Sequence, residues 1–291
     1  MRRRAVELSA ADRERLEYAQ GRRSVDPTAN LFGADSVTWR VSREGVLLLG
    51  GGRALLLQIA HPLVAAGVAA HSDFQRDPLR RLWRTLELTF TIVFADAASA
   101  IRAVRAIEHV HARVRGTLDR GVGSFPKGTA YDASDPRLLF WVHATLVDTA
   151  LLVYERFVGR LSPRMRATYY RESQVTARLF GVPRSVIPST LGEFRDYMDE
   201  MIGGERLTIG PAGRAIADAV LRPRAPLGLR EAMAPVRFLT VGLLPAAVRA
   251  RYGFAWDRPH QALLDAATRA SRFLVPLLPR LVRDFPHVRR A

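Results

Sequence analysis

Hydrophobic residues recur at intervals of three and four along almost the whole chain, which is the pattern of helices that bury one face. The pattern is clearest over residues 136–157, where it predicts a long buried helix. No stretch of four to eight residues alternates convincingly between apolar and polar, as a strand would. We therefore predict an all-α protein with further helices over residues 10–20, 39–49, 53–61, 79–94, 97–117, 163–180, 189–202, 212–222, 229–250, 258–275 and 277–285.

Glycine, proline and capping residues mark the predicted ends of these helices. Three glycines at 50–52 predict a break between two apolar helices, and Pro62 suits the first turn of the next one. Ser162 before Pro163, and Thr190 three residues before Glu193, are typical helix starts. The chain has no repeat or linker, so we expect one multi-helix globular domain, divided into an N-terminal helix and loop (1–34), a core (35–205) and C-terminal helices packed on the core (206–291).

The composition is that of a globular protein with a strongly basic surface. The net charge is +16, and Lys127 is the only lysine, so almost all of the positive charge is arginine. The arginines are spread along the chain and mixed with acids, without a basic block interleaved with aromatic residues. We expect a solvated basic surface and no nucleic-acid partner.

Residues 45–70 are apolar and long enough to cross a bilayer. Because Arg53, Gln58 and His61 interrupt this stretch, we interpret it as buried core helices and expect no transmembrane span. The opening arginines are not followed by the apolar region of a secretory leader, which favours a cytoplasmic protein.

Cysteine is absent, which excludes thiolate metal sites, iron–sulfur clusters and covalent haem attachment. A metal in this protein needs histidine, carboxylate or tyrosine ligands. The spacings HxxxH and HExxH are absent too, which argues against a zinc protease.

Two histidines lie two positions apart in the segment IEHVHARVRG (107–116), so they cannot share a helix face. His111 continues the apolar series of Ala100, Val104 and Ile107, whereas His109 lies at helical spacing from Arg102, Arg105 and Arg113. The periodicity predicts that His111 points into the core and His109 toward solvent. By itself, His111 is most simply a packing residue that donates to a backbone carbonyl.

Three more histidines, His61, His71 and His143, lie in apolar predicted helices. A buried imidazole is costly unless it is hydrogen-bonded or ligated, and four in one core are more than packing requires. A single histidine ligand in an apolar, cysteine-free helical pocket suits non-covalent haem b, whose propionates also need arginines.

The segment DPLRRLWRTLELTF (77–90) places Arg81, Arg84 and Thr85 on one helix face. If that face is buried, its arginines need an anion or an oxygen species as partner. A solvated basic stripe is the alternative.

The order and spacing of several segments resemble one known family, that of the mycophenolic-acid-pathway oxygenase and the latex clearing protein (rubber oxygenase) catalytic domain. The resemblance covers residues 35–200 and fades after about residue 205. It is carried by RALLLQIAHPLVAAGVAAHSDF (53–74), DPLRRLWRT (77–85), VHARVRG (110–116), YDASDPRLLFWVHATLVD (131–148), YERF (154–157), YYRES (169–173) and LFGVP (179–183).

This resemblance implies an all-α core distantly related to globins around a haem pocket. It also implies non-covalent haem b and oxidative cleavage of an isoprenoid carbon–carbon double bond by O₂. His111 matches the proximal iron ligand, and His143 matches a pocket histidine. Arg81, Arg84 and Thr85 match the stretch on the distal side, where Arg84 and Thr85 would polarise oxygen and Arg81 would orient Arg84 or hold a propionate. His61 and His71 match recurring positions around the cofactor whose roles the resemblance does not define.

Two departures from the family pattern affect the expected reaction. Arg84 stands where the rubber-cleaving enzyme has a lysine that can ligate iron, and a guanidinium has no lone pair to give. No glutamate lies between Gly45 and Leu86, where that enzyme has a catalytic base; Asp73 and Asp77 are the acids in this interval. With these departures, the resemblance supports haem binding better than it supports rubber-type cleavage. We expect a haem b oxygenase of an apolar, isoprenoid-like substrate.

Three alternatives to this function stay open at this point. The alternatives are a haem enzyme of another reaction class (peroxide-driven oxidation or dehydration), a non-catalytic haem protein, and a metal-free scaffold. The C-terminal helices are expected to pack on the core. Alternatively, they could line a substrate entry or form a dimer face, so a homo-oligomer is also open.

Overall fold

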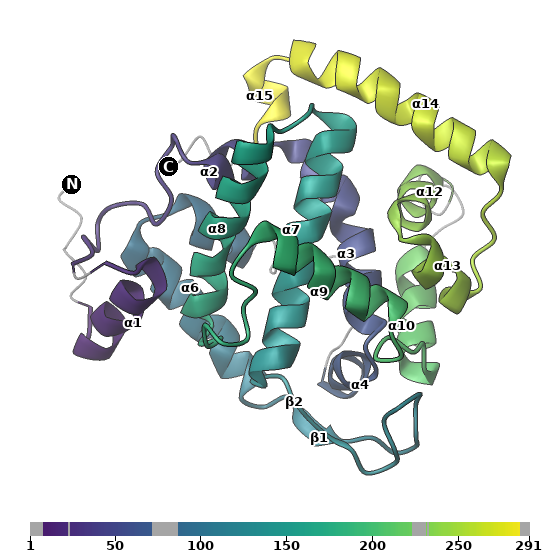
Figure 1. Cartoon of the computed structure of the whole chain (residues 1–291), viewed down its shortest axis with the longest axis horizontal. Coiled ribbons are helices and arrows are strands. Elements are labelled where there is room, and N and C mark those ends of the chain that lie inside the picture. Colours follow the sequence, from purple (N-terminus) through teal and green to yellow (C-terminus); the bar gives the residue numbers. More distant parts are fainter. Residues whose placement is uncertain (1–7, 23, 72–86, 223–230, 232, 286–291) are drawn as a thin grey trace.

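Helix α7 (Pro136–Phe157) runs through the middle of the molecule, with the other helices arranged around it (Figure 1). Its predicted limits are confirmed: Asp135 caps its first turn and Pro136 takes the first helical position. Phe140, Trp141 and Ala144 are almost completely buried on it. The structure, a computed structural model, describes residues 8–22, 24–71, 87–222, 231 and 233–285.

The predicted all-α class is confirmed, because helices make up nearly all of the regular structure described. Helices η1 (Gly45–Gly50), α3 (Gly51–Ile59), α8 (Pro163–Leu179) and α14 (Arg258–Leu274) pack directly on α7. The proposed relation to globins stays a prediction. The remaining helices are α1 (Ala10–Gln20), α2 (Val37–Ser42), α4 (Pro62–His71), α6 (Ala97–His111), α9 (Leu191–Gly203), α10 (Pro211–Leu221), α12 (Ala234–Leu243), α13 (Ala246–Tyr252), η2 (Val275–Leu277) and α15 (Arg280–Arg283).

The predicted helix 39–49 is divided into α2 and η1, and the predicted break at glycines 50–52 is the junction where η1 ends at Gly50 and α3 begins at Gly51. Gly51 and Gly52 lie inside α3. A Cβ atom on Gly50 would lie 2.5 Å from Thr149 of α7, and one on Gly52 would lie 2.1 Å from the Thr240 hydroxyl of α12. These two glycines therefore permit close helix packing.

The predicted helix over residues 97–117 is also too long. After α6 the chain enters strand β1 (Arg115–Thr117), which pairs antiparallel with β2 (Ala130–Asp132), inside the segment expected to be a loop. Gly116 faces Tyr131 across the pair, where an added Cβ would lie 2.6 Å from the phenol oxygen. Cross-strand pairing therefore ends the helix, and the local pattern does not contain that information.

Three other helices differ from their predictions in extent. In place of the predicted helix 277–285, the structure has the end of η2 at Leu277 and the four-residue α15. The predicted helix 229–250 is divided at Pro245 into α12 and α13. Of the predicted helix 79–94, residues 87–94 are helical and the rest lie outside the described residues.

A buried arginine ties three core helices together. Arg53 of α3 is 4% exposed and donates to the Leu243 carbonyl at 2.8 Å, to Asp148 at 2.6 Å and to the Thr149 hydroxyl. Arg53, one of the polar residues within the apolar stretch 45–70, is thus part of the core.

By length and composition, α7 is the one described helix that could cross a membrane, with 44% of its apolar window buried inside the protein. The pair Gly45–Ile59 and Pro62–His71 meets the same criterion only as a broken span, bent by 106°. Core helices meet this criterion as well, and α7 is surrounded by packed helices.

Candidate functional site

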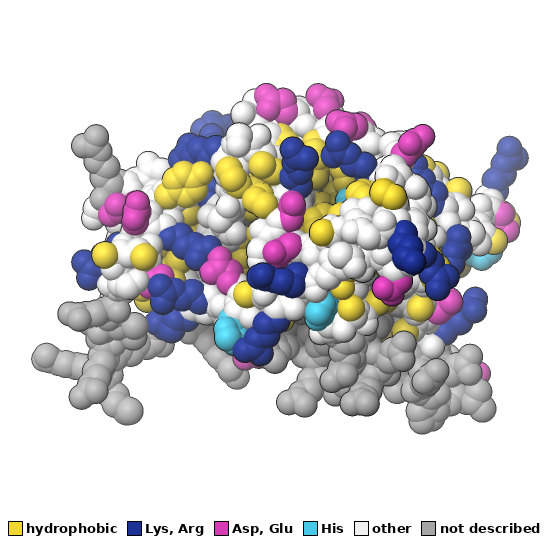
Figure 2. Space-filling view, turned by 90° about the horizontal axis from the view of Figure 1, so that it is seen from below, with side chains coloured by type: hydrophobic (Ala, Val, Ile, Leu, Met, Phe, Trp, Pro, Cys, Tyr) yellow, Lys and Arg dark blue, Asp and Glu magenta, His cyan; other side chains and the backbone are white. Residues whose placement is uncertain are grey.

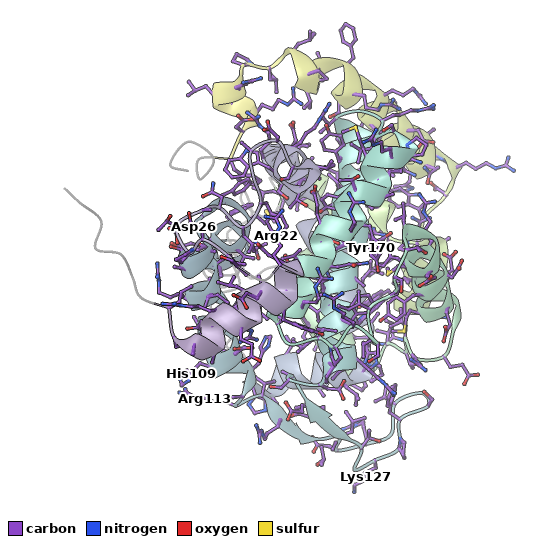
Figure 3. All side chains as sticks on the ribbon, turned by 60° about the vertical axis from the view of Figure 1, so that its left-hand side comes forward. Arg22, Asp26, His109, Arg113, Lys127 and Tyr170 are labelled. Carbon is purple, nitrogen blue, oxygen red and sulfur yellow. The ribbon has the colours of Figure 1, made fainter. Side chains whose placement is uncertain are left out.

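His111 is the last residue of α6, and the structure confirms that it points inward while His109 points outward. Ala100 and Val104 on the same stripe are buried, and His111 is half-buried. His109 is exposed and lies beside Arg113, as Figure 3 shows. The periodicity of the sequence therefore placed both side chains correctly.

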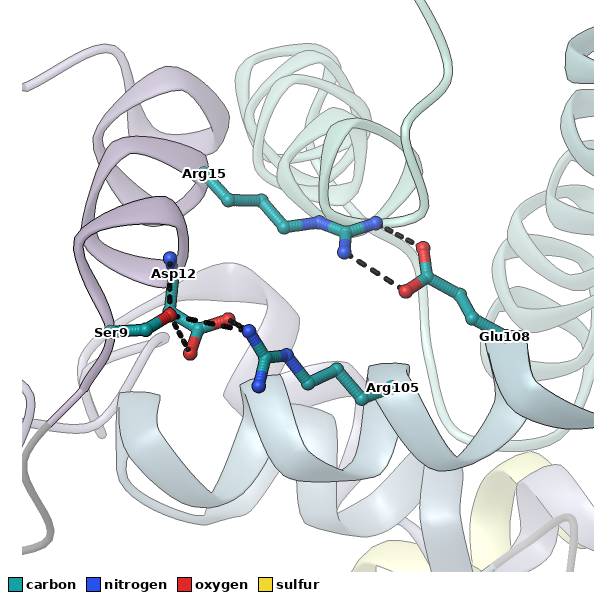
Figure 4. Close-up of polar contacts among 5 residues, drawn as sticks. All are labelled: Ser9, Asp12, Arg15, Arg105 and Glu108. Atoms are coloured by element: carbon teal, nitrogen blue, oxygen red, sulfur yellow. Dashed lines mark hydrogen bonds and ion pairs between the residues drawn. The ribbon is translucent and has the colours of Figure 1, made fainter.

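Two ion pairs hold α6 on α1 (Figure 4). Arg15 makes a two-pronged contact with Glu108, and Arg105 contacts the buried carboxylate of Asp12 at 2.5 Å. Glu108 lies one turn before His111, so this contact fixes the end of the helix that carries the histidine.

Burial favours the neutral form of the His111 imidazole. Burial lowers its pKa, and the nearby carboxylates of Glu108 and Asp132 oppose that shift only in part. Within the described residues, no group hydrogen-bonds this imidazole. A neutral ring without a partner has a free lone pair, which is the requirement for an iron ligand.

His143 lies in the middle of α7, where burial lowers the pKa of its imidazole to about 4. A backbone hydrogen bond with Ser173 of α8 opposes this shift. Leu139 and Leu146 share its side of the helix at spacings of four and three. Leu146 is 43% exposed in this central helix, and α6 is not among the described helices that pack closely on α7. Leu146 therefore contributes exposed apolar surface on the His143 side of α7.

The expectation that His71 is buried is wrong. His71 is exposed because it is the final residue of α4, and its ring Nε2 lies 3.2 Å from the Arg115 carbonyl. The ring also contacts the edge of Tyr131. His71 thus lies at the strand pair that follows His111, outside the core.

His61 is 5% exposed, and its Nδ1 accepts from the Leu63 backbone at 3.3 Å. Burial and the charge of Arg206 lower its pKa to about 4. It lines a pocket of about 620 Å³ that sequence reasoning did not find, since separate segments build it: His61, Leu63, Phe125, Asp135, Arg137, Leu138, Phe140, Trp141, Ser185, Val186, Tyr197, Met201 and Arg206.

Most of the α7 residues that line this pocket lie on the side of the helix away from His143, although the ring of Phe140, which also lines it, is centred 6.4 Å from the His143 ring. At 100° per residue, Arg137, Leu138 and Trp141 point away from His143 and Leu146. Figure 2 views the molecule from the side of the strand pair and shows a hollow with a hydrophobic floor and charged side chains around it. The structure therefore does not bring His61 together with His143.

Arg81, Arg84 and Thr85, the predicted distal residues, lie outside the described residues. Within the described part of the chain, no group of three or more His, Asp or Glu side chains could hold a metal ion. A haem iron needs a single protein ligand, since the macrocycle supplies four nitrogens, so His111 remains sufficient for that cofactor.

Comparisons with known proteins identify the family but not a characterised relative. The chain is 23% identical over 231 residues to the uncharacterized proteins Rv2237 of Mycobacterium tuberculosis and Mb2261 of Mycobacterium bovis, covering 77% of this chain and 87% of theirs. No solved structure matches the chain.

Residues 39–273 match the family described as ER-bound oxygenase mpaB/B′/rubber oxygenase, catalytic domain. The match continues well past residue 205, where the resemblance was expected to fade, and includes most of the C-terminal helices. The chain therefore belongs to the mpaB and rubber oxygenase catalytic-domain family.

Proposed function

We propose that this protein is a haem b-dependent oxygenase that uses O₂ on an apolar, isoprenoid-like substrate. The oxygenase class follows from the family, and the cofactor, the substrate class and the residue roles are the proposal.

The observation that carries the proposal is the state of His111. Its ring is half-buried and without a hydrogen-bond partner among the described residues, its pKa is lowered by burial, and it lies at the end of a helix fixed by ion pairs. A packing histidine would be expected to donate a hydrogen bond to a backbone carbonyl. The ring of His71 makes such a contact with the Arg115 carbonyl when its proton is on Nε2. These features support His111 as the ligand on the proximal side of the iron.

The other candidate residues would hold the haem and donate hydrogen bonds on its opposite face. Bound haem would supply an iron centre able to react with O₂, which no side chain of this chain offers. His143 and Leu146 would contact the macrocycle from α7. By resemblance to the family, Arg84 and Thr85 would donate hydrogen bonds on the opposite face, and Arg81 would orient Arg84 or pair with a propionate. Arg84 acts as a donor here, because a guanidinium cannot ligate iron.

The missing glutamate favours a second candidate, a haem enzyme of another reaction class such as peroxide-driven oxidation or dehydration. Reconstitution of the purified protein with haem b tests the cofactor: we expect a Soret band at one equivalent, and its absence would overturn every haem-based function. Oxygen uptake with linear isoprenoids then separates the candidates. Uptake with substrate cleavage supports the oxygenase, turnover only with added peroxide supports the second candidate, and haem binding without turnover of either kind supports a non-catalytic haem protein.

A further inference from the structure

The C-terminal helices carry an exposed apolar surface, which we call the outer face of α14–α15. Its largest side chains are strongly exposed: Phe273 by 72%, Leu277 and Val282 by 69%, and Leu274 by 56%. Leu263, Leu278 and Leu281 extend it. Figure 1 shows α14 and α15 along the outer edge of the molecule, at the top of the view.

The opposite side of α14 is packed on the core. Leu264 and Thr268 are buried, and the Ser271 hydroxyl donates to the Phe157 carbonyl of α7 at 3.2 Å. The helix is therefore docked, and the exposed apolar residues form a second face on the side away from α7. A contiguous apolar surface of this kind on a protein usually marks an interaction site.

Most of the outer face lies between Asp265 and Asp284, an interval in which every charged residue is an arginine. Between Asp265 and Asp284 the sequence contains Arg269, Arg272, Arg280 and Arg283 and no acid. Arg283 forms an ion pair with Glu44, the N-cap residue of η1. The other three have no carboxylate partner in the part of the chain that the structure describes, and all three are exposed. The outer face thus combines large apolar side chains with unpaired guanidinium groups.

We propose that the outer face of α14–α15 binds the surface of a membrane that contains anionic lipids. An apolar face flanked by arginines is the pattern of helices that lie in the headgroup region, where the apolar side chains enter the lipid and the cations meet phosphates. A second copy of this chain fits less well, because two such faces in contact would bring six unpaired guanidinium groups together. The inference goes beyond the proposed function and does not depend on it.

Vesicle flotation of the purified full-length protein tests this proposal. We expect the protein to float with vesicles of 70% phosphatidylcholine and 30% phosphatidylglycerol, and to bind pure phosphatidylcholine much less. Raising the salt from 0.1 to 0.5 M should weaken binding, because it screens the arginines. Failure to bind the anionic vesicles at low salt would overturn the proposal.

Two aromatic-to-serine variants form a matched pair. Phe273→Ser on the outer face should weaken vesicle binding by about tenfold, from the apolar area withdrawn from lipid. Tyr18→Ser changes an exposed ring on α1, far from α14 in Figure 1, and should leave binding unchanged. Arg269→Gln should weaken binding about fivefold. Equal binding by the Phe273→Ser and Tyr18→Ser proteins would contradict the proposal, as would a dimer in size-exclusion chromatography that Phe273→Ser dissociates without vesicle binding.

Discussion

Two neighbouring glycines in α3 should respond in opposite directions to substitution by alanine. At Gly52, the new Cβ would lie 2.1 Å from Oγ1 and 2.8 Å from Cγ2 of Thr240, although ordinary contacts begin near 3.4 Å. Thr240 is 1% exposed, so it has no free space to enter. At Gly51, no atom other than those of the adjoining residues and of the helix's own backbone lies within 4 Å of the new Cβ.

The expected magnitudes follow from packing and helix propensity. Overpacking costs about 1–3 kcal/mol, and alanine in a helix returns up to about 1 kcal/mol, so Gly52→Ala should destabilise the protein by about 1–2 kcal/mol. Gly51→Ala should stabilise it by up to about 1 kcal/mol. For a chain of this length, 1 kcal/mol corresponds to about 2 °C in Tm.

Thermal unfolding followed by circular dichroism measures both effects. We expect Tm to fall by about 2–4 °C for Gly52→Ala and to rise slightly for Gly51→Ala. In a Thr240→Ala background, which removes the two closest atoms, the cost of Gly52→Ala should decrease by about 1 kcal/mol. Equal Tm values for the two single variants would refute the close approach of α3 and α12.

Other predictions concern the buried polar groups. Arg53→Met keeps most of the side-chain volume but leaves Asp148 and the Leu243 carbonyl without their donor, so urea unfolding should report a loss of about 2–4 kcal/mol. An unchanged midpoint would contradict the network. Burial holds the pKa of His61 and His143 near 4, so the unfolded chain takes up protons below about pH 6.5 whereas the folded protein does not. Stability should be constant above that pH and fall between pH 6.5 and 4, by about 1.4 kcal/mol per pH unit for each histidine. His143→Gln should make this slope shallower, exposed His109→Gln should not, and identical slopes would refute the burial of His143.

Local signals in the sequence were sufficient for most helix ends. Pro136, Ser162 and Thr190 begin or cap their helices as predicted, because capping involves only groups within one turn. The close packing at Gly50 and Gly52 was not predictable, since their packing partners, Thr149 and Thr240, lie about a hundred and two hundred residues away in the sequence.

In the candidate site, too, the sequence predicted some side-chain positions and missed others. Periodicity separated His111 from His109, because both positions belong to one regular helix. It failed for His71, where the helix ends and the ring turns to the strand pair. The pocket around His61 was not predictable, since it joins α4, α7, α9 and the three loops that carry Phe125, Ser185 and Arg206, whose meeting depends on the whole fold.

Haem titration of two histidine variants tests the central claim most directly. The substitutions His111→Ala and His109→Ala lie two residues apart, one at the inward position and one exposed beside Arg113. We expect His109→Ala to bind one equivalent of haem b with the spectrum of the unmodified protein. His111→Ala should lose affinity by more than about tenfold and show a changed Soret band. Full haem occupancy with an unchanged spectrum in His111→Ala would contradict the assignment of His111 as the iron ligand.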